Sequence, residues 1–152
     1  MRVTMTMMMT AVVVLALTGC DRPAEEITAP RVHYGQDVCA ECSMIISDDR
    51  FAGAIGLRRD GRIVHLLFDD VGEMLAFDPG PNDGIRWFAT DASTSAWLDA
   101  EAAVFLRSEK LMTPMGTGVG AYATRDAAER ARTEYGGEIL AFDAFRPARA
   151  GG

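Results

Sequence analysis

The sequence predicts an α+β fold of two consecutive ββαβ units, preceded by a signal peptide and a flexible tether. Residues 38–92 contain alternating, strand-like apolar runs on both sides of a short amphipathic helix. The same order of strands and helix returns in residues 93–146, which predicts an internal duplication. A hydrophobic N-terminal run and a polar, proline-containing segment come before the first unit.

Residues 1–19 have the features of a lipoprotein signal peptide. Arg2 supplies a positive charge, residues 3–17 supply an apolar stretch, and Leu-Thr-Gly-Cys at residues 17–20 matches a lipobox. The apolar stretch is shorter than the roughly 20 residues that a membrane-spanning helix needs. We therefore expect cleavage before Cys20, a lipid on its thiol, and a mature protein anchored on the periplasmic side of a bacterial membrane.

The mature chain is acidic, because removal of Arg2 with the signal peptide changes the formal net charge from −7 to −8. This charge argues against nucleic acid as a partner and against electrostatic adhesion to anionic lipid. Residues 20–37 carry Pro, Gly and acidic residues without apolar periodicity, which predicts a lipid-anchored tether. Residues 147–152 are expected to form a disordered tail.

The first unit is predicted as two strands, a short helix and a third strand. An Asp-Gly turn joins the first two alternating runs. Asp69 or Asp70 is expected to cap the helix, whose apolar residues follow the i, i+3, i+4 spacing, and a Pro- and Gly-rich segment ends it. The strands are expected at residues 51–57, 63–68 and 85–90, and the apolar helix positions are Val71, Met74 and Leu75.

The second unit is predicted to follow a linker at residues 91–101. Thr124 is expected to cap its helix, which continues to Tyr135 and ends at two glycines. Small alanines on one face of this helix are expected to pack inward. The strands are expected at residues 103–107, 118–122 and 138–142.

Two turn segments concentrate sulfur. Residues 39–44 read Cys-Ala-Glu-Cys-Ser-Met, just before the first strand, and residues 112–116 read Met-Thr-Pro-Met-Gly in the second unit. Thiolate and thioether are soft donors, which select Cu(I) over hard cations. A structural zinc site usually needs four Cys or His ligands. The mature chain offers two Cys besides Cys20, with His33 and His65, so the pattern favours Cu(I) held between the two units.

Each candidate ligand also has a structural interpretation. Cys39 and Cys42 could form a disulfide or a redox pair, although the polar segment before them and the isoleucines after them are untypical of a thioredoxin motif. Met112 is expected to fill the core, whereas Met115 lies between Pro and Gly. His65 alternates with apolar strand residues, which favours packing over metal binding. No nucleophile–base arrangement is evident, so an enzyme is not indicated.

These segments, in this order, resemble the nitrous oxide reductase accessory lipoprotein family, NosL. The resemblance covers nearly the whole mature chain and includes the lipobox Cys20. Its other segments are Cys-Ala-Glu-Cys-Ser-Met at 39–44, Phe-Asp-Asp at 68–70, Trp-Leu-Asp-Ala at 97–100, Thr-Pro-Met-Gly at 113–116 with Gly118 after it, and Gly-Gly at 136–137.

The resemblance implies a periplasmic Cu(I) chaperone for the copper centres of nitrous oxide reductase, working with that enzyme's membrane maturation complex, an ABC-type transporter assembly. It also implies a treble-clef-like duplication. Carried over by position, Cys42, Met44 and Met115 would bind copper, with Cys39 as a second thiolate or a redox partner. Ser43 replaces the usual glycine, which predicts an altered loop shape. A dithiol reductant and a metal-free assembly factor remain the alternatives.

Overall fold

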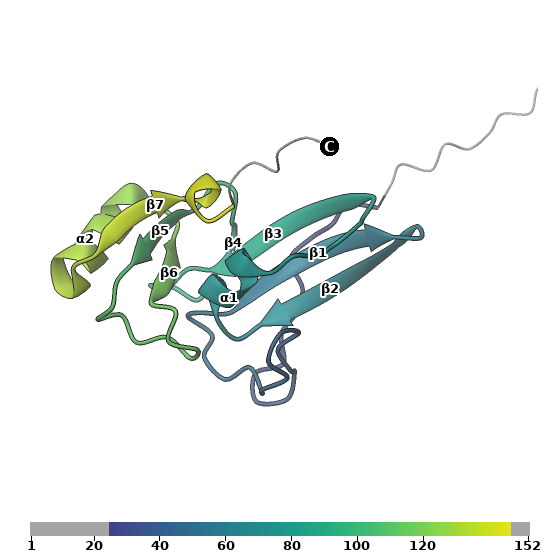
Figure 1. Ribbon diagram of the computed structural model, residues 1–152, viewed down its shortest axis with the longest axis horizontal. Helices are drawn as coiled ribbons and strands as arrows, with labels where there is room; N and C mark the ends of the chain where they lie inside the picture. The colour runs from purple at the N-terminus through teal and green to yellow at the C-terminus, as the bar shows by residue number, and fades with distance from the viewer. Residues whose placement is uncertain (1–24, 147–152) are drawn as a thin grey trace, which may run out of the picture.

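The computed structural model describes residues 25–146 and has the predicted α+β class, with two antiparallel sheets and few helices (Figure 1). The predicted signal peptide, Cys20 and the predicted tail lie outside the described residues. Within the part that is described, no helix is both long and apolar enough to span a bilayer.

The first sheet has the strand order β2-β1-β3-β4, and all its neighbours are antiparallel. The predicted Asp-Gly turn connects the first two strands, and α1 follows the second. Asp70 is the N-cap of α1, as one of the two predicted alternatives. The elements are β1 (Gly53–Arg59), β2 (Arg62–Phe68), α1 (Val71–Ala76), β3 (Gly84–Thr90) and β4 (Trp97–Asp99).

The second sheet has the order β6-β5-β7 and carries the longer helix α2 against it (Figure 1). Thr124 caps α2 as predicted, and Gly136 ends it with a φ of 70°. In both sheets the first strand of the half lies between the second and the third. The elements are β5 (Val104–Arg107), β6 (Val119–Tyr122), α2 (Arg125–Tyr135), β7 (Glu138–Ala141) and the 3-10 helix η1 (Phe142–Ala144).

A shared core joins the sheets, because residues of both halves belong to the same buried cluster. At its centre the ring of Trp87 on β3 packs edge-on against Phe142, with centroids 5.7 Å apart. Asp91 after β3 forms a parallel bridge with Ala121 on β6, and its carboxylate accepts the Ala123 N–H at 2.8 Å. The two halves are therefore packed against each other directly.

The structure differs from the predicted elements at two places. Residues 97–99, expected within a linker, form β4, whose backbone pairs with β3 through Phe88 and Asp99. Phe142, expected at the end of the last strand, instead begins η1, and the turn brings its ring onto Trp87. Both differences arise from contacts with residues far away in the sequence.

The described part of the expected tether, residues 25–37, is packed on the domain. Ile27 is only 8% exposed and forms a cluster with Ala54 on β1 and Phe88 on β3. The Gly35 N–H donates to the Ile46 carbonyl at 2.8 Å. Ile27 and Gly35 therefore attach this segment to the domain, since an apolar side chain among the polar ones gains a buried site.

Candidate metal centre

The Cys-containing loop is a tight turn that closes on itself. Val38 and Ile45 form an isolated antiparallel bridge. Inside this bridge the Cys39 N–H donates to the Met44 carbonyl at 2.8 Å, and the Ser43 N–H donates to the Cys39 carbonyl at 3.0 Å. The loop, residues 38–45, is fixed to the first sheet because the Ala40 N–H donates to the Leu67 carbonyl of β2 at 2.7 Å.

Ser43 has a φ of 61°, which is the left-handed conformation that glycine adopts readily. Ser43 thus takes up a conformation that favours glycine, and the altered loop shape expected from serine stays a prediction. For a residue with a Cβ this conformation costs roughly 1–2 kcal/mol.

Replacing Ser43 by glycine is expected to raise the free energy of unfolding by up to about 1 kcal/mol, since relief of this strain exceeds the added chain entropy of glycine. Ser47→Gly is the matched control, because Ser47 does not have a positive φ. Glycine at that position should therefore lower the free energy of unfolding. Urea unfolding of both variants measures the effect. Equal destabilisation by the two substitutions would contradict the expectation.

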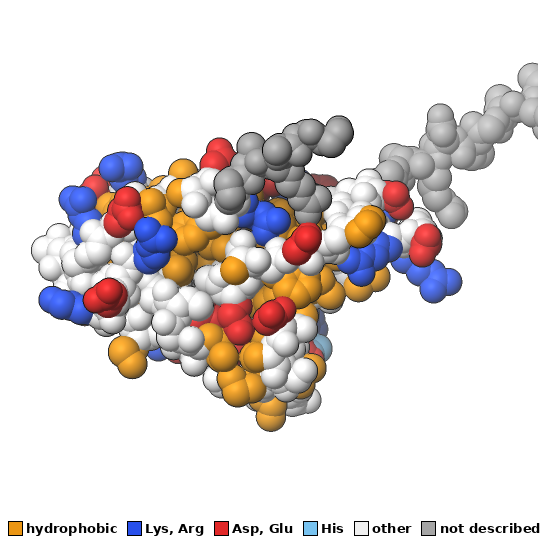
Figure 2. All heavy atoms as spheres, viewed as in Figure 1, with side chains coloured by type: hydrophobic (Ala, Val, Ile, Leu, Met, Phe, Trp, Pro, Cys, Tyr) orange, Lys and Arg blue, Asp and Glu red, His pale blue; other side chains and the backbone are white. Residues whose placement is uncertain are grey.

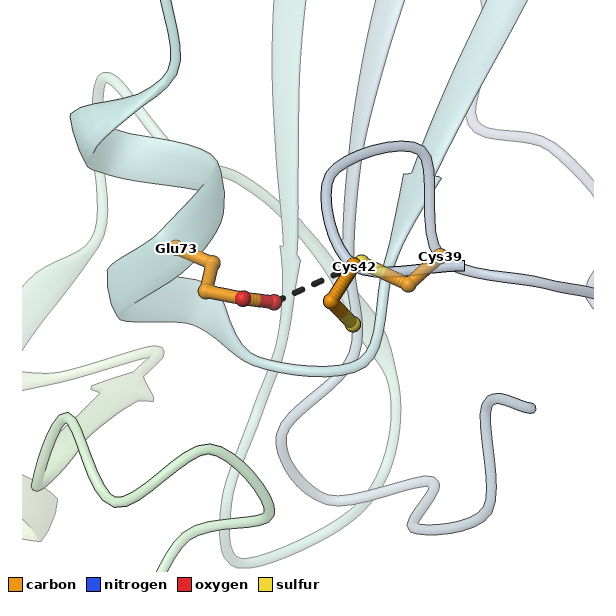
Figure 3. A group of neighbouring side chains, drawn as sticks. All are labelled: Cys39, Cys42 and Glu73. Atoms are coloured by element: carbon orange, nitrogen blue, oxygen red, sulfur yellow. Dashed lines mark hydrogen bonds between the residues drawn. The ribbon is translucent and has the colours of Figure 1, made fainter. Parts of the chain in front are cut away.

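Cys39, Cys42 and Glu73 form a group of three potential metal ligands. Their ligand atoms all lie within 4.8 Å of one another, and the Cys39 thiol donates to Glu73 Oε2 at 3.4 Å. Glu73 extends from α1 toward the cysteine loop (Figure 3). Both cysteines are free thiols, with Cys39 buried and Cys42 partly exposed. The structure thus joins a C-x-x-C pair to a helix carboxylate.

The surroundings of Cys39 and Glu73 shift the pKa values of both side chains. Burial raises the pKa of the Cys39 thiol, while the backbone N–H groups of Cys42, Asp69 and Glu41 act in the opposite direction. Burial also raises the pKa of Glu73, against the lowering effect of the Cys39 hydrogen bond, and the nearby carboxylates raise it further. The thiol therefore keeps its proton in the metal-free protein, and the negative surroundings favour a bound cation.

Two adjacent carboxylates connect the cysteine loop to the methionine loop, residues 112–118. Asp69 accepts the Ser47 N–H at 2.9 Å, just beyond the cysteine loop. Asp70 is completely buried and accepts hydrogen bonds from the Gly72 N–H at 2.8 Å, from Thr113 Oγ1 at 2.6 Å and from the Met115 N–H at 3.1 Å. Thr117 Oγ1 also donates to Asp70. The strand-to-helix junction thereby positions both sulfur-containing loops.

The methionine loop is pressed closely against α1. A Cβ on Gly72 would lie 2.3 Å from Thr117 Oγ1, and a Cβ on Gly118 would lie 2.3 Å from the Ser108 carbonyl oxygen. Gly118 also has a φ of 67°, so this position requires glycine on both grounds. Met112 is 82% exposed, so the expectation that it fills the core is wrong.

The predicted site residues divide into three sets. Cys39 and Cys42 lie together, and Met44 follows them in the same turn with 47% of its side chain exposed. Met115 is half-buried in the methionine loop, which Asp70 holds to the start of α1. His65 is outside this group, on β2, where its Nε2 lies 2.8 Å from the Thr28 carbonyl oxygen.

Glu73 was missed by the sequence analysis. It stands three residues after the N-cap Asp70, where an acidic residue usually turns back to the cap of its own helix. In the structure its side chain faces Cys39 instead. The only sequence signal was its place in the first turn of the helix that follows the Phe-Asp-Asp segment.

Fold and site together define an α+β protein of two antiparallel sheets with a reduced C-x-x-C pair beside a helix carboxylate, a donor group suited to a metal ion. The family model NosL matches residues 32–149, and the chain belongs to this family. Its fold is similar to that of the copper chaperone NosL from Shewanella denitrificans, with a TM-score of 0.66 and 20% sequence identity over 82% of this chain and 100% of that chain. No curated protein sequence matches this chain.

Proposed function

We propose that this protein is a Cu(I) chaperone that binds copper through sulfur at the junction of its two loops. The observation that carries the proposal is the group of Cys39, Cys42 and Glu73, whose ligand atoms lie within 4.8 Å of one another and whose cysteines are not joined in a disulfide. Thiolates are soft donors suited to Cu(I). Membership of the NosL family and the fold shared with a copper chaperone support the same cargo.

The thioethers of Met44 and Met115 are proposed to complete the ligand set with Cys42. Met44 is attached to the cysteine turn, and Asp70 fixes the Met115 backbone to the helix that carries Glu73. The exposed position of Met44 suits a carrier, because an incoming protein can replace a ligand at the surface. Thioethers bind without losing a proton, so they keep contributing when thiols are protonated.

Cys39 is proposed as the second thiolate, with Glu73 as the group that receives its proton. Binding of a metal by a thiol requires loss of the proton. Glu73 accepts the Cys39 hydrogen bond, and backbone N–H groups around the sulfur favour a thiolate once a cation is present. The carboxylate is a hard donor, so we assign it the proton and not the copper ion.

Anaerobic titration of the reduced protein with Cu(I) against a competing chelator tests the proposal. We expect one Cu(I) per chain and the loss of two titratable thiols on binding. Zn(II) provides the comparison, since a site of two thiols and two thioethers should prefer the softer ion. Absence of Cu(I) binding by fully reduced protein would overturn the proposed function and favour a metal-free assembly factor.

Met115→Leu is expected to lower Cu(I) affinity by several-fold while changing the free energy of unfolding by less than about 1.5 kcal/mol, because leucine keeps most of the volume without the thioether. Met112→Leu is the matched control, since Met112 is in the same loop and is 82% exposed. X-ray absorption should show one sulfur fewer in the Met115 variant alone. Wild-type affinity and sulfur count in folded Met115→Leu would exclude it as a ligand.

The recipient is proposed to be nitrous oxide reductase, with its membrane maturation complex of the ABC-transporter type. Membership of the NosL family supports this step. Comparing the copper content of the reductase in cells with and without this protein tests it. The redox alternative, in which the free Cys39 and Cys42 reduce a partner, predicts instead that Met115→Leu leaves function intact.

The protein is proposed to reach the periplasmic side of the membrane as a lipoprotein anchored through Cys20, a residue outside the described part. Cys20→Ala is expected to abolish incorporation of labelled lipid while leaving Cu(I) affinity unchanged, because the proposed ligands all lie far along the chain. Equal labelling of the variant and the wild type would contradict the lipobox assignment.

The two halves are proposed to derive from an internal duplication. Each half has the order strand, strand, helix, strand, and in each sheet the first of these strands lies between the other two. The two sulfur-containing loops are at different positions in the two units, one before β1 and one between β5 and β6, so each half supplies its own donors to a shared site.

A further inference from the structure

The surface around the cysteine loop carries an unusual share of exposed apolar side chains. Among the described residues, six large hydrophobic side chains are exposed, and four of them lie between residues 34 and 45. Figure 2 shows hydrophobic side chains gathered at the lower edge of the view, below a group of acidic ones. We call these four residues the apolar patch: Tyr34, Val38, Met44 and Ile45, exposed by 37%, 55%, 47% and 54%.

The fold does not need the side chains of Val38 and Ile45 to be apolar. Val38 and Ile45 are paired in the antiparallel bridge, so both side chains lie on the same face of the loop. Their neighbours Cys39 and Ile46 alternate to the opposite face, where they are 1% and 0% exposed. The inward face supplies the packing of this loop, and the outward pair stays in water.

Acidic residues border the apolar patch. Residues 33–49 contain four of them and no Lys or Arg: Asp37, Glu41, Asp48 and Asp49. Asp48 and Asp49 lie close enough to Tyr34 to raise the pKa of its hydroxyl, although burial is the larger cause. Arg50, the nearest following base, is bound to Asp48 at 2.7 Å and also interacts with Asp49, but one base against four acids leaves this segment with an excess of negative charge.

We infer that the apolar patch is the docking surface for the protein that receives copper, with an apolar centre and Lys or Arg side chains around it. The inference rests on the proposed function, since the patch contains Met44, a proposed copper ligand, and three of its residues lie in the loop that carries Cys42. A second copy of this chain would bring like charges together, and an anionic lipid surface would repel the same carboxylates. A protein surface with an apolar centre and a border of Lys or Arg complements both the apolar patch and the acidic residues around it.

Binding to a defined acceptor tests this surface. The full chain is loaded with Cu(I), and its affinity for the apo-reductase and for the solubilised maturation complex is measured separately. We expect Val38→Ser and Ile45→Ser together to weaken binding to the apo-reductase, the proposed recipient, by at least tenfold. An effect on the maturation complex alone would overturn the recipient as the occupant. Val64→Ser is the matched control, because Val64 is 41% exposed on β2 and should stay within twofold of wild type.

A second pair of variants tests the acidic residues around the apolar patch. Asp49→Asn should slow association with the same acceptor and reduce its dependence on salt, because fewer charges attract the basic surface. Asp143→Asn on η1, away from the loop, should change neither. Cu(I) affinity and the rate of copper removal by a small chelator should be unaltered in all four variants, because a chelator needs no docking surface.

The outcomes separate the inference from the proposed function. Failure of the wild-type chain to bind Cu(I) removes both. Normal Cu(I) binding, with acceptor affinity absent in the wild type or unchanged in the double variant, overturns the docking surface alone. A homodimer that is seen in sedimentation and is abolished in the double variant would also overturn the docking surface. Binding of the wild-type chain to phosphatidylglycerol vesicles would do the same if it depended on Val38 and Ile45.

Discussion

Replacing Cys42 by serine is expected to weaken Cu(I) binding at least tenfold, equivalent to about 1.4 kcal/mol. The substitution exchanges a soft, ionisable donor for a hard, neutral one at a partly exposed position, so the fold should be retained. Competition titration with a Cu(I) chelator gives the affinity, and circular dichroism checks the fold.

Ala40→Ser is the control for this experiment, because it adds a hydroxyl to the same exposed turn without removing a sulfur. Its Cu(I) affinity should equal that of the wild type. Cys39→Ser should also weaken binding, and a larger loss than in Cys42→Ser would make the buried thiol the stronger ligand. Unchanged affinity in Cys42→Ser would exclude Cys42 from the site.

Asp70→Ala is expected to lower the free energy of unfolding by about 3 kcal/mol or more. The substitution removes the helix cap and leaves the Met115 N–H and two threonine hydroxyls without their buried acceptor. Urea unfolding followed by circular dichroism measures the loss. Cu(I) affinity should fall as well, because the loop that carries Met115 loses its attachment to α1.

Two comparison variants show whether the loss of stability is specific to Asp70. Asp69→Ala removes a single hydrogen bond, from the Ser47 N–H, and should cost less than Asp70→Ala. Asp143→Ala lies at an exposed position and should change the free energy of unfolding by less than about 0.5 kcal/mol. A loss below about 1 kcal/mol in Asp70→Ala would contradict the central role of this carboxylate.

Local signals in the sequence were sufficient for most of the elements. The Asp-Gly turn marks the first hairpin, and Asp70 and Thr124 cap the two helices as their side chains allow. These features depend on neighbours within a few residues, so a single sequence contains them. Met74, predicted on the inward helix face, is completely buried.

Long-range contacts explain what the sequence could not supply. Three residues form β4 only because β3 offers a free edge, and Ile27 is buried only because Ala54 and Phe88 form a site for it. The same holds at the candidate centre. Asp70 was predicted as one of two alternative caps, but its bonds to the methionine loop depend on the packing of the two halves. Glu73 joins Cys39 for the same reason.

The neighbouring carboxylates of Asp69 and Asp70 have a consequence for the tolerance of the chain to insertions. One peptide bond separates the residue that holds Ser47 from the residue that holds Met115, so an added residue there would shift the two loops by up to about 3.8 Å. The connection at residues 78–83 after α1 is tied to the first hairpin, where the Arg59 guanidinium donates to the Pro79 carbonyl and the Asp83 N–H donates to the Arg58 carbonyl, but these hydrogen bonds reach neither sulfur-containing loop. Length changes should therefore be accepted in that connection and rejected between residues 68 and 71, whatever side chains are chosen.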